Sequence, residues 1–210
     1  MDKVVVVGGG GHAKVLICIL KKMKAYKIIG YTDIKNRGEI LGVHYLGNDD
    51  TLSKIIKKEK HCNAVIGVGS VDLSEQRKRI KMLVDSLGFD LPAIVSPNAV
   101  LNEGVTIGKA TVVFDGAVIN SGAKIGECSI INTNSTVEHD CEIGDYVHIA
   151  TGAVLSGGVR VGNNSFVGAG VNIIQYKTIC QNCLIGAGST VVENCLTPGT
   201  YVGIPAQKVK

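Results

Sequence analysis

Residues 105–126 read VTIGKATVVFDGAVINSGAKIG and belong to a longer repeat that runs from Val95 to Val191. An aliphatic residue occupies every sixth position of this stretch without interruption. A period of six matches neither the 3.6-residue turn of an amphipathic helix nor the alternation of a simple strand. It is typical of a parallel β-helix made of hexapeptide repeats, in which three hexads close one coil. The positions are Val95, Leu101, Ile107, Val113, Ile119, Ile125, Ile131, Val137, Ile143, Ile149, Leu155, Val161, Val167, Ile173, Ile179, Ile185 and Val191.

A second set of positions, two residues before each aliphatic one, carries mostly small side chains, with Lys177 as an exception. We expect both sets to point inward, so that residues one coil apart stack in columns such as Ile107, Ile125, Ile143, Val161 and Ile179. Glycine often follows the aliphatic residue, and we expect turns with φ > 0 at these places because glycine adopts them without strain. They are Gly108, Gly126, Gly144, Gly162, Gly168 and Gly186.

Length and charge exclude several classes. The chain has 210 residues and a formal net charge of +4, which is too small to indicate nucleic-acid binding. Two basic clusters, at 54–60 and 77–81, are interpreted as solvated helix faces. We recognise no signal peptide and no apolar run of the roughly 18–20 residues that a membrane-spanning helix needs. We therefore expect a cytoplasmic protein without membrane insertion.

The seven cysteines are expected to be reduced. Cys141, Cys183 and Cys195 fall on inward small-residue positions, where a thiol packs as a small apolar group. Cys180 and Cys183 form a C-x-x-C pair, but no second pair at zinc spacing accompanies it. We therefore expect no metal site.

The N-terminal residues predict an α/β unit. A strand over Lys3–Val7 is followed by the glycine run 8–11 and by a helical pattern from Val15 to Met23. A second strand is expected over Ile28–Thr32. Strand, glycine loop and helix place backbone N–H groups at a helix N-terminus, where an anion is stabilised. A glycine turn that only packs the helix on the sheet is the alternative.

Gly8, Gly10 and Ala13 fit the dinucleotide fingerprint G-x-G-x-x-A, with Asp33 about twenty residues on. However, the α/β part ends near Pro92, so it corresponds to one half of a Rossmann fold and favours a smaller nucleotide. Further elements are predicted in this half. They are helices over Leu52–Lys60 and 74–87 (capped by Ser74 and ended by Gly88), a third strand over Ala64–Val68 and a fourth over Phe89–Ile94.

Ligands of open α/β sheets bind at the carboxyl ends of the strands. Several polar or glycine positions of the predicted unit lie at such ends, and we expect them to line one crevice. They are Gly10, Gly11, His12, Asp33, Gly69 and Ser70.

His139 is the candidate general base of the repeat region. It follows the aliphatic Val137 by two residues, so it should lie at a turn and point outward, between the carboxylates of Glu138 and Asp140. A carboxylate beside an exposed imidazole supports its basicity and fixes its tautomer. An ordinary surface histidine is the alternative interpretation.

Three segments together carry a family resemblance: GGGGHA at 8–13, NSTVEHDCEIGDYVHI at 134–149 and GIPA at 203–206. With them the whole chain resembles the bacterial sugar acetyltransferases. That family includes sialic acid O-acetyltransferase and the N-acetyltransferase for UDP-4-amino-4,6-dideoxy sugars of bacillosamine synthesis. The resemblance implies a left-handed β-helix, a homotrimer, acetyl-CoA between neighbouring β-helices and a nucleotide sugar on the N-terminal domain. The expected domains are 1–92 (α/β, half-Rossmann), 93–196 (left-handed β-helix) and 197–210 (C-terminal tail).

The resemblance also implies roles for single residues. His139 matches the general base, and Asp140 matches its acidic partner, which is often glutamate in the family. His148 matches a contact to acetyl-CoA. Backbone contacts to the pantetheine arm match Gly168, Ala169, Gly186 and Ala187, and contacts to the nucleotide sugar match Gly10, Gly11, His12, Asp33, Gly69 and Ser70. Gln207 stands where the family usually has a basic residue, and Lys208 follows it.

The implied activity is direct transfer of an acetyl group from acetyl-CoA to a sugar hydroxyl or amine, in surface-glycan synthesis and without a metal. The sequence leaves O- or N-acetylation, the sugar and its nucleotide open. One alternative is a non-catalytic nucleotide-sugar sensor on the same fold. A zinc carbonic anhydrase would need three histidine ligands, whereas only His139 and His148 are at hand. A Rossmann oxidoreductase would need a second half-domain.

Overall fold

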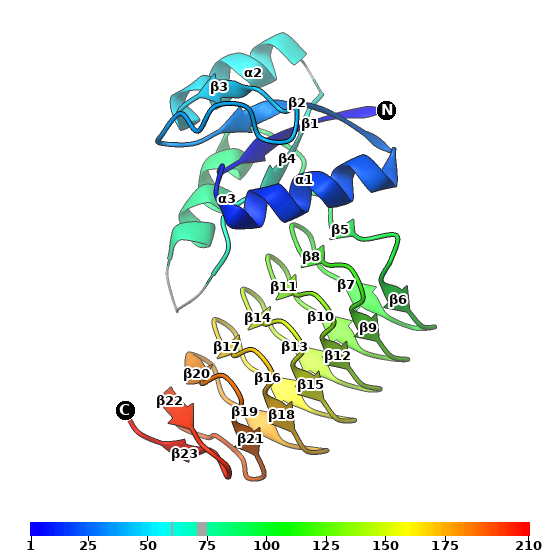
Figure 1. Ribbon diagram of the computed structural model, residues 1–210, viewed down its shortest axis with the longest axis vertical. Coiled ribbons are helices and arrows are strands. Elements are labelled where there is room, and N and C mark those ends of the chain that lie inside the picture. Colours follow the sequence, from blue (N-terminus) through cyan, green and yellow to red (C-terminus); the bar gives the residue numbers. More distant parts are fainter. Residues whose placement is uncertain (60, 71–74) are drawn as a thin grey trace. The chain divides into compact units, whose positions relative to one another are not determined.

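The computed structural model describes residues 1–59, 61–70 and 75–210. The chain divides into two compact units (Figure 1). The first contains Met1–Gly69 and Glu75–Pro97, and the second contains Ser70 and Asn98–Lys210.

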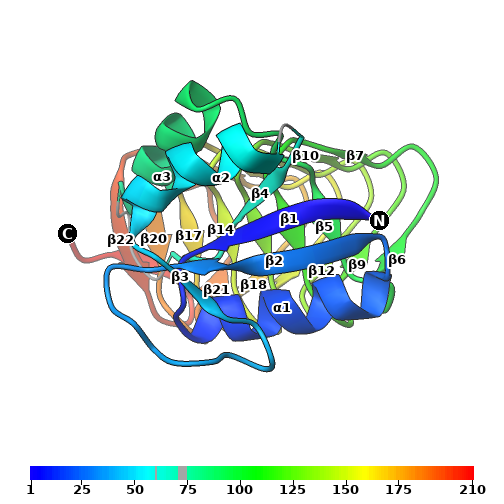
Figure 2. The same cartoon turned by 90° about the horizontal axis from the view of Figure 1, so that it is seen from above.

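The first unit is a parallel α/β sheet with the strand order β3-β2-β1-β4. Val4 to Val7 of β1 are fully buried, as expected for a central strand covered on both faces. Figure 2 shows the four strands side by side, with α1 alongside β1 and β2 and with α3 beside β4. The elements are β1 (Asp2–Val7), α1 (Gly11–Met23), β2 (Tyr26–Thr32), β3 (Tyr45–Gly47), the 3₁₀ helix η1 (Asp49–Thr51), α2 (Leu52–Glu59), β4 (Asn63–Ile66) and α3 (Gln76–Ser86).

The predicted fourth strand was wrong. Phe89–Ile94 does not join this sheet as a strand: Asp90 makes one isolated bridge to Asn63, and a short strand, β5, covers Ile94–Val95. The sheet is completed instead by β3, which was not predicted because its three residues are too few to give a periodic pattern. Helix α3 begins at Gln76 and ends at Ser86. The predicted cap Ser74, and Lys60 at the end of the predicted second helix, lie outside the described residues.

The second unit is a left-handed parallel β-helix, as predicted, and Figure 1 shows its coils stacked one on another. Its three walls follow the strand orders β7-β10-β13-β16-β19, β8-β11-β14-β17-β20 and β6-β9-β12-β15-β18-β21. The strands are β6 (Val100–Leu101), β7 (Thr106–Ile107), β8 (Val112–Val113), β9 (Val118–Ile119), β10 (Lys124–Ile125), β11 (Ile130–Ile131), β12 (Thr136–Val137), β13 (Glu142–Ile143), β14 (His148–Ile149), β15 (Val154–Leu155), β16 (Arg160–Val161), β17 (Phe166–Val167), β18 (Asn172–Ile173), β19 (Thr178–Ile179), β20 (Cys183–Ile185) and β21 (Thr190–Val191).

The predicted stacking is confirmed, although in the first coil Leu101 is exposed and Ile107 is only half-buried. Ile125 pairs with Ile107 and Ile143, and Val161 continues the column to Ile179. Ile125, Ile143, Val161 and Ile179 are buried, and so are the small positions Ala123, Cys141 and Val159. Aliphatic and small side chains together therefore fill a narrow interior at each level.

The prediction about glycine was wrong in its physical reason. Positive φ occurs three residues after the aliphatic position, as at Gly122, Asp140 and Gly158. The glycines directly after the aliphatic residue are required because neighbouring coils approach closely there. A Cβ atom at Gly162 would lie 2.5 Å from the backbone nitrogen of Gln181, and one at Gly168 would lie 2.6 Å from that of Ala187.

The C-terminal segment extends one wall of the β-helix. Strand β22 (Gly199–Val202) pairs in parallel with β20, and β23 (Gln207–Lys208) pairs antiparallel with β22. The Lys208 ammonium donates a hydrogen bond to Thr197 Oγ1 at 3.2 Å, while Gln207 is exposed.

The predicted burial of the cysteines is confirmed, whereas the predicted exposure of Arg77 is wrong. All seven cysteines are free thiols, and Cys141, Cys183 and Cys195 are buried as predicted. Arg77, which was assigned to a solvated face, is buried at 3% exposure, and its guanidinium donates to the carbonyl oxygen of Val68. No helix of the described residues has both the length and the apolarity that crossing a membrane requires.

Candidate active site and nucleotide crevice

His139 lies at a turn between β12 and β13, where its side chain is exposed. Its Nδ1 atom is 2.8 Å from Oδ2 of Asp140. A carboxylate only accepts hydrogen bonds, so this contact places the proton on Nδ1 and leaves the lone pair on Nε2. Asp140 holds its carboxylate there from a left-handed backbone conformation (φ = 60°), which aspartate tolerates better than most residues. The pair therefore presents a basic nitrogen to solvent.

The imidazole of His139 packs against the backbone of the next coil. The backbone N–H of Gly158 donates to the carbonyl oxygen of His139 at 2.9 Å. A Cβ atom at Gly157 would lie 2.4 Å from His139 Nε2, so the imidazole lies directly over that glycine. Tyr176, one further coil along, covers Gly158 in the same manner. The absence of a side chain at 157 thus creates the space that the imidazole occupies, and its absence at 158 does the same for the Tyr176 ring.

His148 differs from His139 because it is 7% exposed. Its Nδ1 contacts the carbonyl oxygen of Ser70, and its Nε2 is 3.0 Å from the amide nitrogen of Asn132. Its ring meets the Phe166 ring edge-on, with centroids 5.1 Å apart. Since a carbonyl accepts and an amide N–H donates, Nδ1 carries the proton and the ring is held in one tautomer.

The glycine–alanine pairs at 168–169 and 186–187 lie at the same turn of successive coils. Gly168 donates its N–H to the carbonyl oxygen of Ile185, and Gly188 donates to that of Ala169, both at 2.8 Å. Ala169 and Ala187 are exposed and have small side chains, so a ligand can approach the backbone of both turns there. This geometry suits the extended arm of a ligand that runs along the coils.

In the α/β unit, five of the six predicted substrate positions line one cavity of about 310 Å³. They are Gly10, Gly11, His12, Asp33 and Gly69. Gly10 is the N-cap of α1, and a Cβ atom at Gly10 or Gly11 would meet nothing within 4 Å. The helix N-terminus is therefore open to a ligand, and its backbone N–H groups favour an anion. Ser70 does not line this cavity and contacts His148 instead.

Asp33 organises the glycine loop. Its Oδ2 accepts the backbone N–H of Gly9 at 2.7 Å and Nε of Arg37 at 3.2 Å, and its Oδ1 accepts the N–H of Lys35 at 2.9 Å. Burial alone would raise the pKa of Asp33, but these donors outweigh it and lower the pKa. The carboxylate is therefore ionised and holds the loop against the end of β2.

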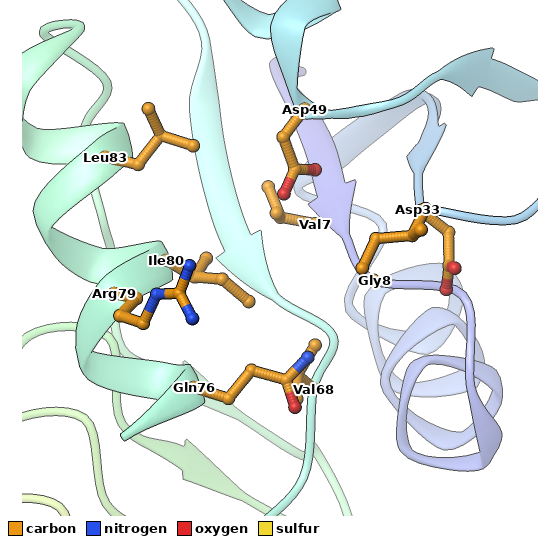
Figure 3. Close-up of a pocket in the computed structure, with 10 residues that line it drawn as sticks. Val7, Gly8, Asp33, Asp49, Val68, Gln76, Arg79, Ile80 and Leu83 are labelled. Carbon is orange, nitrogen blue, oxygen red and sulfur yellow. The ribbon is translucent and has the colours of Figure 1, made fainter. Parts of the chain in front are cut away.

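A second cavity of about 330 Å³ adjoins the first, and the two share Asp33, Ile34, Val68 and Gln76. Figure 3 shows Asp49 and Arg79 at this cavity on different elements, with the apolar side chains of Val7 and Ile80 beside them. Sequence reasoning missed Asp49, Gln76 and Arg79 because none belongs to a recognisable motif. Arg37 also lines the first cavity and forms an ion pair with Asp33.

In residues 1–59, 61–70 and 75–210, no group of three or more His, Cys, Asp or Glu is arranged to hold a metal ion. The Sγ atoms of Cys180 and Cys183 are 3.4 Å apart, as two thiols in contact. Burial, and then the hydrogen bond with Cys180, raise the pKa of Cys183 to about 12.

Comparison with known proteins agrees with this description. The PglD N-terminal domain model matches residues 3–82, and the bacterial transferase hexapeptide model matches residues 122–157 and 140–175. The comparison with curated protein sequences gave no significant match.

Two solved structures are similar along their whole length. The acetyltransferase domain of PglB from Neisseria gonorrhoeae is 30% identical, with a TM-score of 0.92 and complete coverage of both chains. A perosamine N-acetyltransferase mutant from Caulobacter crescentus, in complex with CoA and GDP-perosamine, is 31% identical. Its TM-score is 0.93, and the match covers 100% of this chain and 98% of that one. The chain therefore belongs to the PglD-type family of hexapeptide-repeat N-acetyltransferases.

Proposed function

We propose that this protein transfers the acetyl group of acetyl-CoA to the amino group of a nucleotide-linked amino sugar, with His139 as the general base. The observation that carries the proposal is the 2.8 Å contact between His139 Nδ1 and Asp140, which leaves a basic Nε2 at an exposed turn. The PglB domain also occurs in complex with acetyl-CoA, and the perosamine enzyme holds CoA with GDP-perosamine. The nucleotide sugar in the second complex, GDP-perosamine, supports a role in glycan biosynthesis.

The chemistry is a single acyl transfer. The amine nitrogen attacks the thioester carbonyl carbon and forms the new C–N bond, while Nε2 of His139 takes the amine proton. Collapse of the tetrahedral intermediate breaks the C–S bond, and the imidazolium returns a proton to the departing sulfur. The products are the N-acetyl sugar and the CoA thiol, and the base is regenerated. General-base catalysis contributes about 10²–10⁴-fold to such a step.

Binding of the two substrates is assigned to two regions. The pantetheine arm runs along the open turns at 168–169 and 186–187, beside His148 with its fixed tautomer. The sugar nucleotide places its phosphates at the N-terminus of α1, near Gly10, Gly11 and His12, where the helix dipole and the backbone N–H groups favour anions. Asp33 and Gly69 line that cavity, and Ser70 supports His148. We further propose a homotrimer, with acetyl-CoA between neighbouring β-helices.

The test is a steady-state assay of CoA thiol release. The panel contains UDP-, dTDP- and GDP-linked amino sugars together with free and CMP-linked sialic acids. We expect turnover with an amino sugar and a fall in kcat of about 10²–10⁴-fold for His139→Ala. His61→Ala, an exposed histidine outside both regions, serves as the matched control. Near-normal turnover of His139→Ala would refute the assignment, and so would an absence of acetyl-CoA binding in calorimetry.

A further inference from the structure

The second cavity of the α/β unit has the properties of a site for a flat heterocycle. It lies beside β1, β4 and α3, and its volume of about 330 Å³ exceeds what one nucleobase needs. Val7, Val68, Ile80 and Leu83 give it an apolar lining. It is continuous with the cavity at the N-terminus of α1 through Asp33, Ile34, Val68 and Gln76. A nucleotide with its phosphates at α1 can therefore reach this cavity with its base.

Asp49 supplies a fixed hydrogen-bond acceptor on one side of this pocket. It is the first residue of η1, and its Oδ1 accepts the hydroxyl of Thr32 at 2.8 Å. The carboxylate is half-buried and points into the pocket in Figure 3. A carboxylate offers only acceptors, so it is matched by a ligand edge that carries donors.

Arg79 supplies donors from the opposite element. It projects from α3, and Figure 3 shows its guanidinium reaching into the pocket from the side away from Asp49. A guanidinium offers a fork of N–H donors, which pairs with two neighbouring acceptors. The pocket is therefore complementary to a base that has hydrogen-bond donors on one edge and acceptors on another.

Guanine matches both edges with two hydrogen bonds each, more than the other bases offer. Its N1–H and N2–H₂ groups form a two-donor edge for a carboxylate, and its O6 and N7 atoms form the acceptor pair that arginine binds in a bidentate manner. Uracil has a single N3–H between two carbonyl groups, which would face the carboxylate of Asp49 with repulsion. Adenine and cytosine each carry a single exocyclic amino group beside an acceptor ring nitrogen, so neither offers the carboxylate of Asp49 two neighbouring donor atoms.

We propose that this pocket selects guanine, so that the sugar acceptor is a GDP-linked amino sugar, with Asp49 and Arg79 as the residues that determine base specificity. The inference rests on the proposed function for the identity of the ligand as a sugar nucleotide. Each bidentate pair discriminates between bases by about ten- to a hundred-fold in affinity.

The test is calorimetric titration of the full-length protein with GDP, UDP, ADP and CDP, without acetyl-CoA. We expect the Kd of GDP to be at least about ten-fold below that of the other three. Inosine diphosphate, which lacks the 2-amino group, should bind about ten-fold more weakly than GDP, because Asp49 then has one donor instead of two. UDP binding as tightly as GDP would overturn the proposal.

Asp49→Asn is the informative variant. The asparagine amide oxygen can still accept the hydrogen bond from the Thr32 hydroxyl, so the fold should be retained. The negative charge and the second acceptor oxygen of the carboxylate are lost. We expect GDP affinity to fall about ten- to a hundred-fold and the difference between GDP and inosine diphosphate to disappear. Asp50→Asn makes the same charge change at the next residue, which does not line the pocket, and should leave GDP binding unchanged. Retained GDP affinity in Asp49→Asn would remove Asp49 from the proposal.

The experiments can distinguish failure of the guanine assignment from failure of the proposed acetyltransferase function. Thiol release that occurs with a UDP- or dTDP-linked amino sugar, combined with weak GDP binding, would sink the guanine assignment and leave the acetyltransferase intact. Tight GDP binding without any thiol release would sink the acetyltransferase and leave the guanine pocket intact.

Discussion

The imidazole of His139 lies over the backbone of Gly157, so closely that a Cβ atom at residue 157 would stand 2.4 Å from Nε2. This contact makes Gly157 a positioning residue for the proposed base. Gly157→Ala should therefore push the imidazole off its site and lower kcat by about ten- to a hundred-fold, because small displacements in a catalytic geometry are costly.

The matched control for this variant is Gln175→Ala, which changes the same turn position one coil further on and should leave kcat unchanged. Circular dichroism should show an intact β-helix in both. If Gly157→Ala retained full kcat, the support of His139 by the neighbouring coil would have no catalytic meaning.

Asp140 is expected to act through His139. Asp140→Asn can keep the left-handed turn, since asparagine also tolerates positive φ, but it removes the charge that stabilises the imidazolium. We expect kcat to fall about ten- to a thousand-fold while the KM for acetyl-CoA changes little. Asp140→Glu should recover part of the loss, and this rescue distinguishes a positioning role from a purely structural one.

Asp33 should make the stability of the α/β unit depend on acidity. Its pKa lies below the ordinary 3.8, so its hydrogen bonds to Gly9, Lys35 and Arg37 stabilise the fold above that value. The stabilisation is lost as the pH falls through the lowered pKa of the folded state. Asp33→Asn should therefore unfold at a lower urea concentration at neutral pH, and the difference should shrink at acidic pH. Helical circular dichroism measures this directly. An equal difference at all pH values would contradict it.

The cysteines should differ sharply in reactivity. Burial raises the pKa of Cys62, Cys141 and Cys195 to about 11 and removes them from solvent, whereas Cys18 is exposed on α1. Because the thiolate is the reactive form, iodoacetamide at mildly alkaline pH should label Cys18 first. Peptide mass spectrometry locates the label, and acetyl transfer should survive it. Loss of activity on Cys18 labelling would contradict a transfer that uses no cysteine.

The two units differ in how well sequence patterns predict their structure. Each hexad of the β-helix repeats the same contacts with the coils before and after it, so the period that starts at Val95 predicts both the pairing of Ile125 with Ile143 and the burial of both. The outward position of His139 follows from the same period. The α/β unit has no such repetition, and there the three-residue strand β3 was missed and Phe89–Ile94 was assigned wrongly.

What the sequence by itself determined is the architecture of the repeat, the outward His139–Asp140 pair and the glycine loop at the start of α1. These depend on contacts at fixed or short separations along the chain, which periodicity and local motifs record. Only the tertiary structure decided which turn positions have positive φ, why Gly157 must lack a side chain, and that Asp49 and Arg79 face one pocket. Such features arise where segments from different elements meet, at separations along the chain that follow no period.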